Sequence, residues 1–353
     1  MAVHIPAEGL QQVAGNQVVP LSPAEITGLF CHAATEELVA MANATCRRVH
    51  GRDVLLRGLI EYSNVCSCDC LYCGIRHGNR RVKRYRMEES AILAVVEEGY
   101  NRGFRSFVLQ GGEDPDYTTG RICRLVGMIK GQGREDAAVT LSCGMRRRNE
   151  YQAMAQAGVD RYLLRFETAD PRLHFSLRRR TLADRLEALD GIRDAGLQVG
   201  SGYMLGLPGE TPEIQLENIL LCQSLQLDMI GVGPFIPHPD TPLGGAGQQP
   251  LEAVIRGLAL LRLALPEAHL PATTAAGSLV ADGREQMLAA GANVLMPNLT
   301  PMIFKENYLL YPNKVCLLEK GVEDLAGLAG QLLPLDRKLS FARGDALRIA
   351  RKN

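Results

Sequence analysis

The sequence has no excess of charge of either sign, because 39 Lys and Arg residues balance 39 Asp and Glu residues. A chain without a global positive field is not expected to attract nucleic acid or an anionic membrane over long distances. It also lacks an apolar run near the ~20 residues that a bilayer requires, since the longest candidate, 257–266, contains Arg262. The N-terminus has neither the basic nor the apolar region of a secretion signal. We therefore predict a soluble, cytoplasmic protein without nucleic-acid or membrane partners.

Two basic runs, 80–84 and 146–148, depart locally from this balance. Aromatic residues are not interleaved with them, as they are in platforms that bind single-stranded nucleic acid. We predict that these runs are solvated loops or part of a surface that contacts a partner.

The composition excludes disordered and collagen-like chains, because charged residues make up 22% of the sequence and hydrophobic residues 46%. The 36 Gly and 18 Pro residues indicate frequent turns. A length of 353 residues fits one large α/β barrel with extensions, or two smaller domains.

Short apolar or β-branched runs alternate with amphipathic helical stretches, several of them opened by capping residues such as Thr181 and Thr211. Alternation of this kind indicates parallel βαβ units, and eight of them favour a closed (β/α)8 barrel of the TIM type over a doubly wound open sheet. The predicted strands are 54–62, 106–110, 138–143, 161–167, 198–205, 229–235, 270–275 and 293–298. The predicted helices are 89–103, 118–131, 149–158, 182–196, 212–226, 251–264 and 282–290.

The run 161–167 helps to decide between the two architectures. With a period of two, Arg161, Leu163, Arg165 and Glu167 share one face of a strand. Both faces of an open parallel sheet are covered by helices and should be apolar, whereas a barrel that holds a polar ligand needs a charged inner face. The barrel is therefore favoured. We predict an N-terminal arm and helices over 1–50, the barrel over 51–315 and a C-terminal extension over 316–353.

Four of the ten cysteines lie within eight residues, at positions 66, 68, 70 and 73. Cys66, Cys70 and Cys73 have C-x3-C-x2-C spacing, which can present three thiolates to three irons of one [4Fe–4S] cube and leave the fourth iron open. A structural zinc site is the alternative, but closed zinc sites usually pair two separated C-x2-C elements and the sequence has no second one. We predict that Cys68 is not a ligand, and that the six scattered cysteines are small buried side chains.

The spacing, with Tyr72 before the last cysteine, resembles the signature of the radical S-adenosylmethionine (radical SAM) superfamily, whose barrel agrees with the eight predicted strands. The resemblance implies two cofactors, a [4Fe–4S] cluster on Cys66, Cys70 and Cys73 and SAM on its open iron. One-electron reduction then cleaves SAM to a 5′-deoxyadenosyl radical. These cysteines would be the catalytic residues.

Further motifs resemble the SAM-binding elements of the superfamily. Residues 110–113 (QGGE) resemble its GGE motif, in which glycine allows the backbone to approach SAM. The stretch 202–210 resembles its adenine-contacting strand, with Glu210 one residue later than in the family pattern. The implied SAM-binding residues are Tyr72, Gln110, Gly111, Gly112, Glu113, Glu167, Arg185 and Met204.

Longer stretches are similar to the [FeFe]-hydrogenase maturases of the superfamily, over about 50–320. The similarity implies an enzyme that helps to assemble the diiron subcluster of the hydrogenase active site, acting on a cysteine-bound iron carbonyl cyanide precursor that contains sulfur. It implies as partners a small-molecule or organometallic substrate, other hydrogenase maturases and a one-electron donor such as a ferredoxin or flavodoxin. The stretches are 59–66, 73–76, 83–87, 161–170, 199–204 and 228–242.

The substrate residues implied by this resemblance are mostly hydroxyl or guanidinium groups near strand ends. An arginine among them is suited to hold a carboxylate with two hydrogen bonds. The set is Thr140, Arg161, Arg165, Met229, Thr273, Thr274, Met296, Tyr308 and Tyr311.

Two related activities stay open on the sequence. Methylornithine synthase shares much of the local sequence and would rearrange the carbon skeleton of lysine. Biotin synthase has a similar layout, but its second cluster needs cysteines on several strands, and Cys143 is the single candidate here. Some hydrogenase maturases bind a second cluster near the C-terminus. We predict none in this chain, because Cys316 stands alone and Asp324 and Gly327 occupy the expected partner positions.

Overall fold

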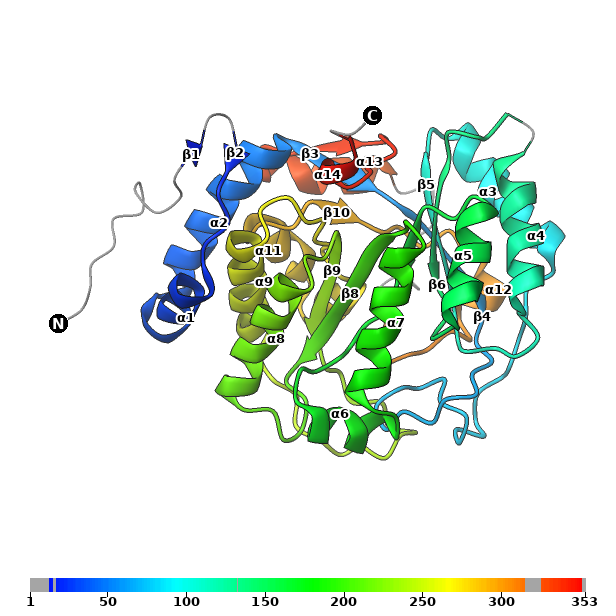
Figure 1. The fold of residues 1–353 in the computed structure, drawn as a ribbon, viewed down its shortest axis with the longest axis horizontal. Helices are drawn as coiled ribbons and strands as arrows, with labels where there is room; N and C mark the ends of the chain where they lie inside the picture. Colours follow the sequence, from blue (N-terminus) through cyan, green and yellow to red (C-terminus); the bar gives the residue numbers. More distant parts are fainter. Residues whose placement is uncertain (1–12, 15–16, 132, 315–324, 351–353) are drawn as a thin grey trace.

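The computed structural model describes residues 13–14, 17–131, 133–314 and 325–350. A short hairpin of β1 (Val13–Ala14) and β2 (Gln17–Val18) precedes helices α1 (Pro23–His32) and α2 (Thr35–His50). Helix α1 begins at Ser22, whose hydroxyl accepts from the Glu25 N–H while the Glu25 carboxylate accepts from the Ser22 N–H. In Figure 1 both helices pack beside α9 at one flank of the molecule.

Six parallel strands form the main sheet in sequence order, as expected of consecutive βαβ units. Helices cover its outer face (Figure 1). The strands are β4 (Gly58–Ser63), β5 (Ser106–Gly111), β6 (Ala138–Ser142), β7 (Arg161–Leu163), β8 (Gln198–Leu205) and β9 (Met229–Pro234). The helices between and after them are α3 (Glu89–Asn101), α4 (Thr119–Lys130), α5 (Arg148–Gln156), α6 (Pro171–Arg178), α7 (Leu182–Asp194), α8 (Pro212–Ser224), α9 (Glu252–Ala264), α10 (Thr274–Leu279), α11 (Gly283–Ala289) and α12 (Met302–Lys305).

A second sheet and single bridges connect β9 back to β4, so the architecture is the predicted TIM-type barrel. Strand β3 (Asp53–Leu56) continues into β4 and pairs with β10 (Val294–Leu295). Isolated parallel bridges join Met229 to His269, Pro271 to Val294 and Leu59 to Asn298. The predicted strand 270–275 is therefore shorter than expected, because Thr273 already caps α10 by accepting from the Ala276 N–H.

The predicted strand 161–167 also differs from expectation. Ladder pairing ends at Leu163, and Glu167 has a φ of 69° with a single bridge to Tyr203. Leu163, Arg165 and Glu167 still line one cavity, whereas Arg161, the first residue of β7, binds Asp345 of the C-terminal segment.

The chain after residue 325 closes the amino-terminal end of the barrel. It comprises α13 (Leu325–Leu332), the 3-10 helix η3 (Leu333–Leu335), β11 (Lys338–Ser340) and α14 (Leu347–Ala350), and β11 pairs with β3. The Arg348 guanidinium forms an ion pair with Asp228 just before β9. These segments lie at the upper end of the barrel in Figure 1, opposite the loops that carry the cysteines.

The core lies between the strands and the surrounding helices, where residues such as Phe107, Val139 and Leu260 are fully buried. None of the described helices is long and apolar enough to cross a membrane. The domain limits 1–50, 51–315 and 316–353 stay a prediction.

Candidate active site

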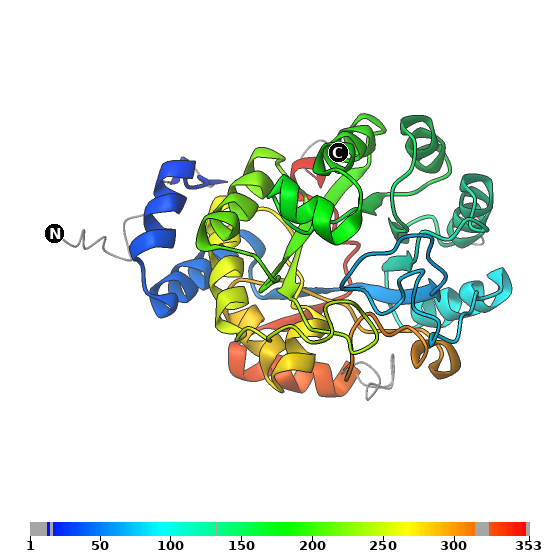
Figure 2. The same cartoon turned by 90° about the horizontal axis from the view of Figure 1, so that it is seen from below.

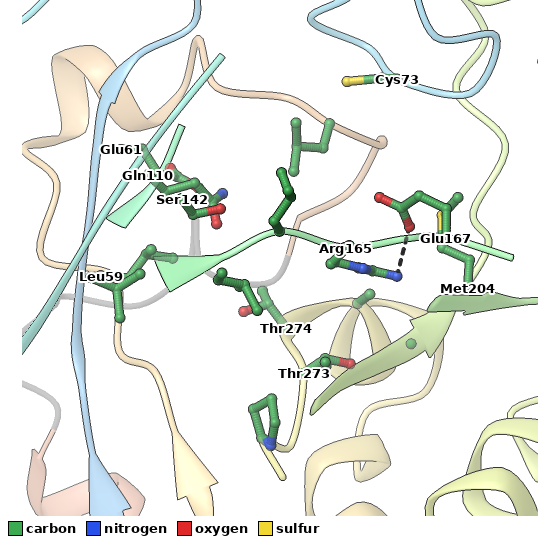
Figure 3. Close-up of a pocket in the computed structure, with 18 of the residues that line it drawn as sticks. Leu59, Glu61, Cys73, Gln110, Ser142, Arg165, Glu167, Met204, Thr273 and Thr274 are labelled. Carbon is green, nitrogen blue, oxygen red and sulfur yellow. Dashed lines mark ion pairs between the residues drawn. The ribbon is translucent and has the colours of Figure 1, made fainter. Parts of the chain in front are cut away.

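A cavity of about 360 Å³ opens at the carboxyl end of the barrel strands, where TIM-type barrels carry their functional residues. Figure 2 looks onto this end, and Figure 3 shows side chains from several strands converging in the cavity. Every predicted site residue except Arg161 lines it. Those residues are Cys66, Tyr72, Cys70, Cys73, Gln110, Gly111, Gly112, Glu113, Thr140, Arg165, Glu167, Arg185, Met204, Met229, Thr273, Thr274, Met296, Tyr308 and Tyr311.

The loop between β4 and α3 carries the four clustered cysteines. Hydrogen bonds from the Arg84 side chain to backbone carbonyls of the same loop hold its shape. The Arg84 guanidinium donates to the carbonyls of Asn64 at 2.7 Å, Ile75 at 2.8 Å and Arg76 at 2.7 Å. The loop is also hydrogen-bonded to the segment after α12, where the Leu310 carbonyl accepts from the Gly74 N–H at 2.9 Å. A Cβ at Gly74 would lie 2.0 Å from the Leu309 carbonyl oxygen, so only glycine allows this approach.

The cysteine thiols differ in how readily they ionise. A hydrogen bond from Cys68 lowers the pKa of Cys66 to about 7, against burial, and the same neighbour with Arg178 lowers the pKa of Cys70 to about 6. Burial raises the pKa of Cys73 above its ordinary value. Thiolates are the form that binds iron, and two of the three predicted ligands are therefore prepared for deprotonation.

The donor set fits an iron–sulfur cube. Over the residues that the structure describes, no three His, Cys, Asp or Glu side chains are grouped so that they could hold a single metal ion. A cube places each thiolate on a different iron, so its ligands do not need to meet at one point. Cys66, Cys70 and Cys73 all line the cavity, which leaves room for the cluster inside it.

The glycine loop after β5 lies directly against the cysteine loop. A Cβ on Gly112 would lie 2.2 Å from the Val65 carbonyl oxygen and 2.7 Å from the Cys66 Cβ. The Glu113 N–H donates to the Cys66 Sγ at 3.4 Å, and its carboxylate pairs with Arg180 at 3.1 Å. Glycine here brings the two loops into backbone contact beside the thiols.

Arg185 is a buried cation with unused donors. Its side chain is 2% exposed, and its Nε and one Nη have no hydrogen-bond partner. Burial, followed by the nearby Arg178, lowers the pKa of Arg185. An unpaired buried guanidinium is costly, and the cavity beside it can admit an anionic group. This observation fits the carboxylate of SAM.

Glu167 lies between two arginines at the same end. Its carboxylate is 3.1 Å from Arg165 and 3.8 Å from Arg178, whose Nη1 donates to the Tyr72 hydroxyl at 2.6 Å. Figure 3 marks the ion pair with Arg165. Glu167 adopts a positive φ while its backbone is held against β8. Its N–H donates to the Gly202 carbonyl, and its carbonyl accepts from the Met204 N–H.

Glu210 does not line the cavity. Its carboxylate accepts from the Gly206 N–H at 2.7 Å and from Gln215 at 3.2 Å. Glu210 lies one residue later than in the superfamily pattern. Its carboxylate therefore forms hydrogen bonds within the loop after β8 and stabilises that turn.

The deeper part of the cavity carries the predicted substrate residues. Arg165 donates to the Tyr203 carbonyl at 2.6 Å, while its Nε and the Thr140 hydroxyl have no partner. Thr273 and Thr274 approach from the opposite wall in Figure 3. Free donors and hydroxyls that line a cavity can hold a polar or anionic molecule.

Arg161 lies outside the cavity, contrary to the prediction for this residue. Its guanidinium is fully buried and binds Asp345 at 2.8 Å, Ser106 at 3.0 Å and Gln198 at 3.2 Å at the amino-terminal end of the barrel. A carboxylate of the chain itself already occupies its anion-binding position. The reason is its position along the barrel, because Arg161 is the first residue of β7, at the amino-terminal end where Asp345 of the C-terminal segment binds it.

Five residues with Arg, Lys, His or Glu side chains line the cavity without having been predicted, and so does Ser142 on β6. Leu59 and Glu61 lie on β4 and Arg57 directly precedes it, and the three residues line the cavity at a period of two. The alternation test that identified Arg165 would have found them as well. The other three, Arg178, His269 and Lys314, lie after strands or in connections, where no periodic signal marks them. Cys316 and Asp324, on which the absence of a second cluster was argued, lie outside the described residues.

Comparisons with known proteins identify the family of this chain. The model of the Radical SAM superfamily matches residues 60–220. The [FeFe] hydrogenase maturase subunit HydE of Thermotoga maritima is 44% identical over 315 residues, 89% of this chain and 90% of that protein. A biotin synthase of Magnetococcus marinus is 31% identical, covering 77% of this chain and 84% of its own.

Solved structures support the fold. The crystal structure of methylornithine synthase has a TM-score of 0.77 at 24% identity and covers 91% of this chain and 95% of its own. The maturase HydG of Carboxydothermus hydrogenoformans has a TM-score of 0.75 at 17% identity, covering 91% of this chain and 76% of its own. The barrel, the thiols beside its glycine loop and the 44% identity to HydE, in an alignment that covers about nine-tenths of both chains, show that this chain belongs to the HydE family of the radical SAM superfamily.

Proposed function

We propose that this radical SAM enzyme helps to assemble the diiron subcluster of the [FeFe]-hydrogenase active site, and that its substrate is a cysteine-bound iron carbonyl cyanide precursor supplied by a partner maturase. The observation that carries the proposal is one continuous cavity, in which the three thiols lie at the mouth and arginine and threonine side chains lie deeper. The relationship to HydE gives the reaction class.

The chain's own residues would divide the work as follows. Cys66, Cys70 and Cys73 would each hold one iron, and the bound cluster with SAM supplies a 5′-deoxyadenosyl radical after one-electron reduction. Arg185 would pair with the SAM carboxylate, and Glu167 with its amino or ribose groups. Gln110, Gly111, Gly112, Glu113, Tyr72 and Met204 would complete the SAM site.

Substrate would bind deeper in the barrel. Arg165 would hold the carboxylate of its cysteine part, helped by Thr273 or Thr274, with Tyr308 or Tyr311 above it. Thr140, Met229 and Met296 would complete the walls. Since Arg165 is already 3.1 Å from Glu167, substrate and SAM would be neighbours. The electron would come from a ferredoxin or flavodoxin.

The test is anaerobic reconstitution with iron and sulfide, followed by SAM cleavage with each candidate substrate. The iron–cysteine precursor is expected to divert SAM from free 5′-deoxyadenosine to a product that contains adenosyl or altered substrate. If lysine is rearranged while the iron–cysteine precursor leaves the product distribution unchanged, a methylornithine synthase activity replaces this proposal.

Arg185→Gln is expected to weaken SAM binding by about 1–3 kcal/mol, the usual value of a hydrogen bond to a charged group. Calorimetry on the reconstituted enzyme measures the change. Arg193→Gln is the matched control, since its guanidinium binds the Leu225 carbonyl outside the cavity. Equal SAM affinity in Arg185→Gln and the parent enzyme would remove Arg185 from the cofactor site.

Arg165→Lys is expected to impair hydrogenase maturation by at least about tenfold while leaving iron content and SAM affinity nearly unchanged. Lysine keeps the charge but loses the planar fork that binds a carboxylate with two hydrogen bonds. A coupled maturation assay measures the loss, with Arg124→Lys on the exposed face of α4 as control. Parental activity in Arg165→Lys would place the substrate elsewhere.

A further inference from the structure

A second cavity, of about 250 Å³, lies beside the amino-terminal end of the barrel. It shares no lining residue with the active-site cavity over the described part of the chain. Helix α2 contacts α11, α11 contacts η3, and the Arg47 side chain donates to the Leu335 carbonyl at 2.6 Å. We use the name flank cavity for the space that these segments enclose. Its lining residues are Asn43 and Arg47 on α2, Leu288 and Ala289 on α11, and 334–337.

Arg337 is the buried cation of the flank cavity, and only 2% of its surface is exposed. Its Nε donates to the Arg52 carbonyl at 3.4 Å, and its Nη2 donates to the Asp53 carbonyl at 3.2 Å. Its Nη1 has no hydrogen-bond partner, and Arg337 forms no ion pair with any residue that the structure describes. A buried guanidinium with an unused donor is costly unless an acceptor of opposite charge reaches it.

A second buried guanidinium lies close enough to feel the charge of Arg337. Arg262 is fully buried, and its acceptors are uncharged: they include the Gly291 carbonyl at 2.9 Å and the Asn293 side-chain oxygen at 3.0 Å. Burial, and to a smaller degree the positive charge of Arg337, lowers the pKa of Arg262. Among the described residues neither arginine has a carboxylate partner, so two positive charges stand here without a counter-charge.

The acidic side chain in the lining does not supply that counter-charge. The Asp336 carboxylate is 2.9 Å from the Arg47 guanidinium and 2.5 Å from that of Arg52. The hydrogen bond from Arg47, followed by the charge of Arg52, lowers the pKa of Asp336. Asp336 is therefore ionised and already has two cationic partners. Arg47, Arg52 and Arg337 against this one carboxylate leave the flank cavity with net positive charge.

We infer that the flank cavity is a binding site for a small oxyanion, a carboxylate or phosphate group, with Arg337 as its buried cation. The planar guanidinium matches the geometry of both groups, and Nη1 is free to donate. Asn43 in the same lining offers an amide donor. A cavity of about 250 Å³ exceeds the space of about 30 Å³ that one water occupies in the liquid. It therefore admits a small organic molecule that carries the oxyanion.

An oxyanion at Arg337 would hold the C-terminal segment against the barrel. Helices α2 and α11 form one side of the flank cavity, and residues 334–337 form the other. Arg337 is followed directly by β11, which pairs with β3, and then by Asp345, whose carboxylate binds Arg161. A ligand that contacts both sides stabilises the closed amino-terminal end, because it binds the closed arrangement alone. This site is independent of the proposed function.

The test is calorimetric titration of the reconstituted holoenzyme, with SAM present, at an ionic strength held constant with chloride. Inorganic phosphate and malonate are the two probes. Arg337→Gln removes the cation, and Ala289→Leu keeps every hydrogen bond of Arg337 but fills the cavity from α11. Arg124→Gln on α4 and Ala94→Leu on α3 are matched controls, since both residues are exposed and line neither cavity.

At least one probe is expected to bind the parent enzyme and both controls saturably, with one site per chain. Its affinity should fall about tenfold or more in Arg337→Gln and in Ala289→Leu, since a hydrogen bond to a charged group is lost or its space is filled. If Arg337→Gln does not fold, Ala289→Leu carries the test. Binding of phosphate alone or of malonate alone identifies the oxyanion as phosphate or carboxylate.

Hydrogen exchange locates the bound probe. Amides of β11 should exchange more slowly when the probe is present, and those of the cysteine loop should not change. Three results would overturn the site: no saturable binding of either probe, parental affinity in Ala289→Leu, or protection confined to the cysteine loop, which would place the anion among the active-site arginines.

Discussion

Serine in place of Cys66, Cys70 or Cys73 is expected to abolish cluster assembly, whereas Cys68→Ser is expected to retain it. The [4Fe–4S] cube needs a thiolate on each protein-bound iron, and a serine hydroxyl is not ionised near neutral pH. Iron per chain should fall from about four to near zero in each of the three variants. Iron and sulfide analysis, with EPR of the reduced protein, measures the result.

Cys123→Ser is the control for this series, because Cys123 is a half-buried free thiol on α4, remote from the cavity lining. The decisive comparison is between Cys66 and Cys68. Both line the cavity, and Cys68 lies within hydrogen-bonding contact of Cys66 and Cys70. Loss of the cluster in Cys68→Ser together with its retention in Cys66→Ser would reverse the ligand assignment.

Lys314→Met is expected to destabilise the fold by about 3–5 kcal/mol, the usual cost of breaking a buried ion pair by removing one partner. Lys314 forms an ion pair with Glu61, and their side chains are 4% and 1% exposed. Lys314 also donates to the Tyr308 carbonyl at 3.1 Å, and the Asn298 side chain donates to Glu61 at 2.9 Å. The variant would leave the Glu61 carboxylate buried without its cation.

The matched control removes both charges, as Glu61→Gln with Lys314→Met. Most of the lost stability should return, because two neutral side chains of similar size replace two charges that each required a partner. Urea unfolding monitored by circular dichroism measures each free energy of unfolding. If Lys314→Met costs less than about 1 kcal/mol, the value of an exposed pair, the ion pair does not hold the segment after α12 against β4.

This ion pair also has a consequence for the site. The segment after α12 carries Tyr308 and Tyr311 into the cavity wall, and it is attached to the cysteine loop through Gly74 and Leu310. The Lys314→Met variant is therefore expected to loosen the predicted cap over the substrate while leaving the three thiols in place.

Local sequence was sufficient for most secondary structure and for the chemistry at the mouth. Capping residues and periodicity placed α3, α4, α7 and α8 within about two residues of their observed limits. The spacing of the cysteines and the glycine pair after β5 identified two loops that the structure brings into contact. Both signals are short range, since neighbouring residues along the chain determine turn geometry and ligand spacing.

Arg161 and Arg165 show where a local pattern stops being informative. Period-two alternation assigned both to one face of a strand, but the ladder of β7 ends at Leu163 and the two guanidinium groups lie in different environments. Arg161 binds Asp345, which is 184 residues later, and Arg165 binds Glu167. The partner of a buried charge depends on which distant segment closes over it, and alternation within one strand contains no such information.

The sequence by itself determined the barrel class and the three thiol ligands proposed for the cluster, because helix caps, strand periods and ligand spacings are properties of contiguous residues. Its resemblance to a known family pointed to most of the other predicted residues that line the cavity. Only the tertiary structure decided that Lys314 pairs with Glu61 and that the C-terminal segment closes the amino-terminal end of the barrel, where Asp345 binds Arg161. These are long-range contacts, and their energies come from burial and charge pairing between segments that only the closed barrel brings together.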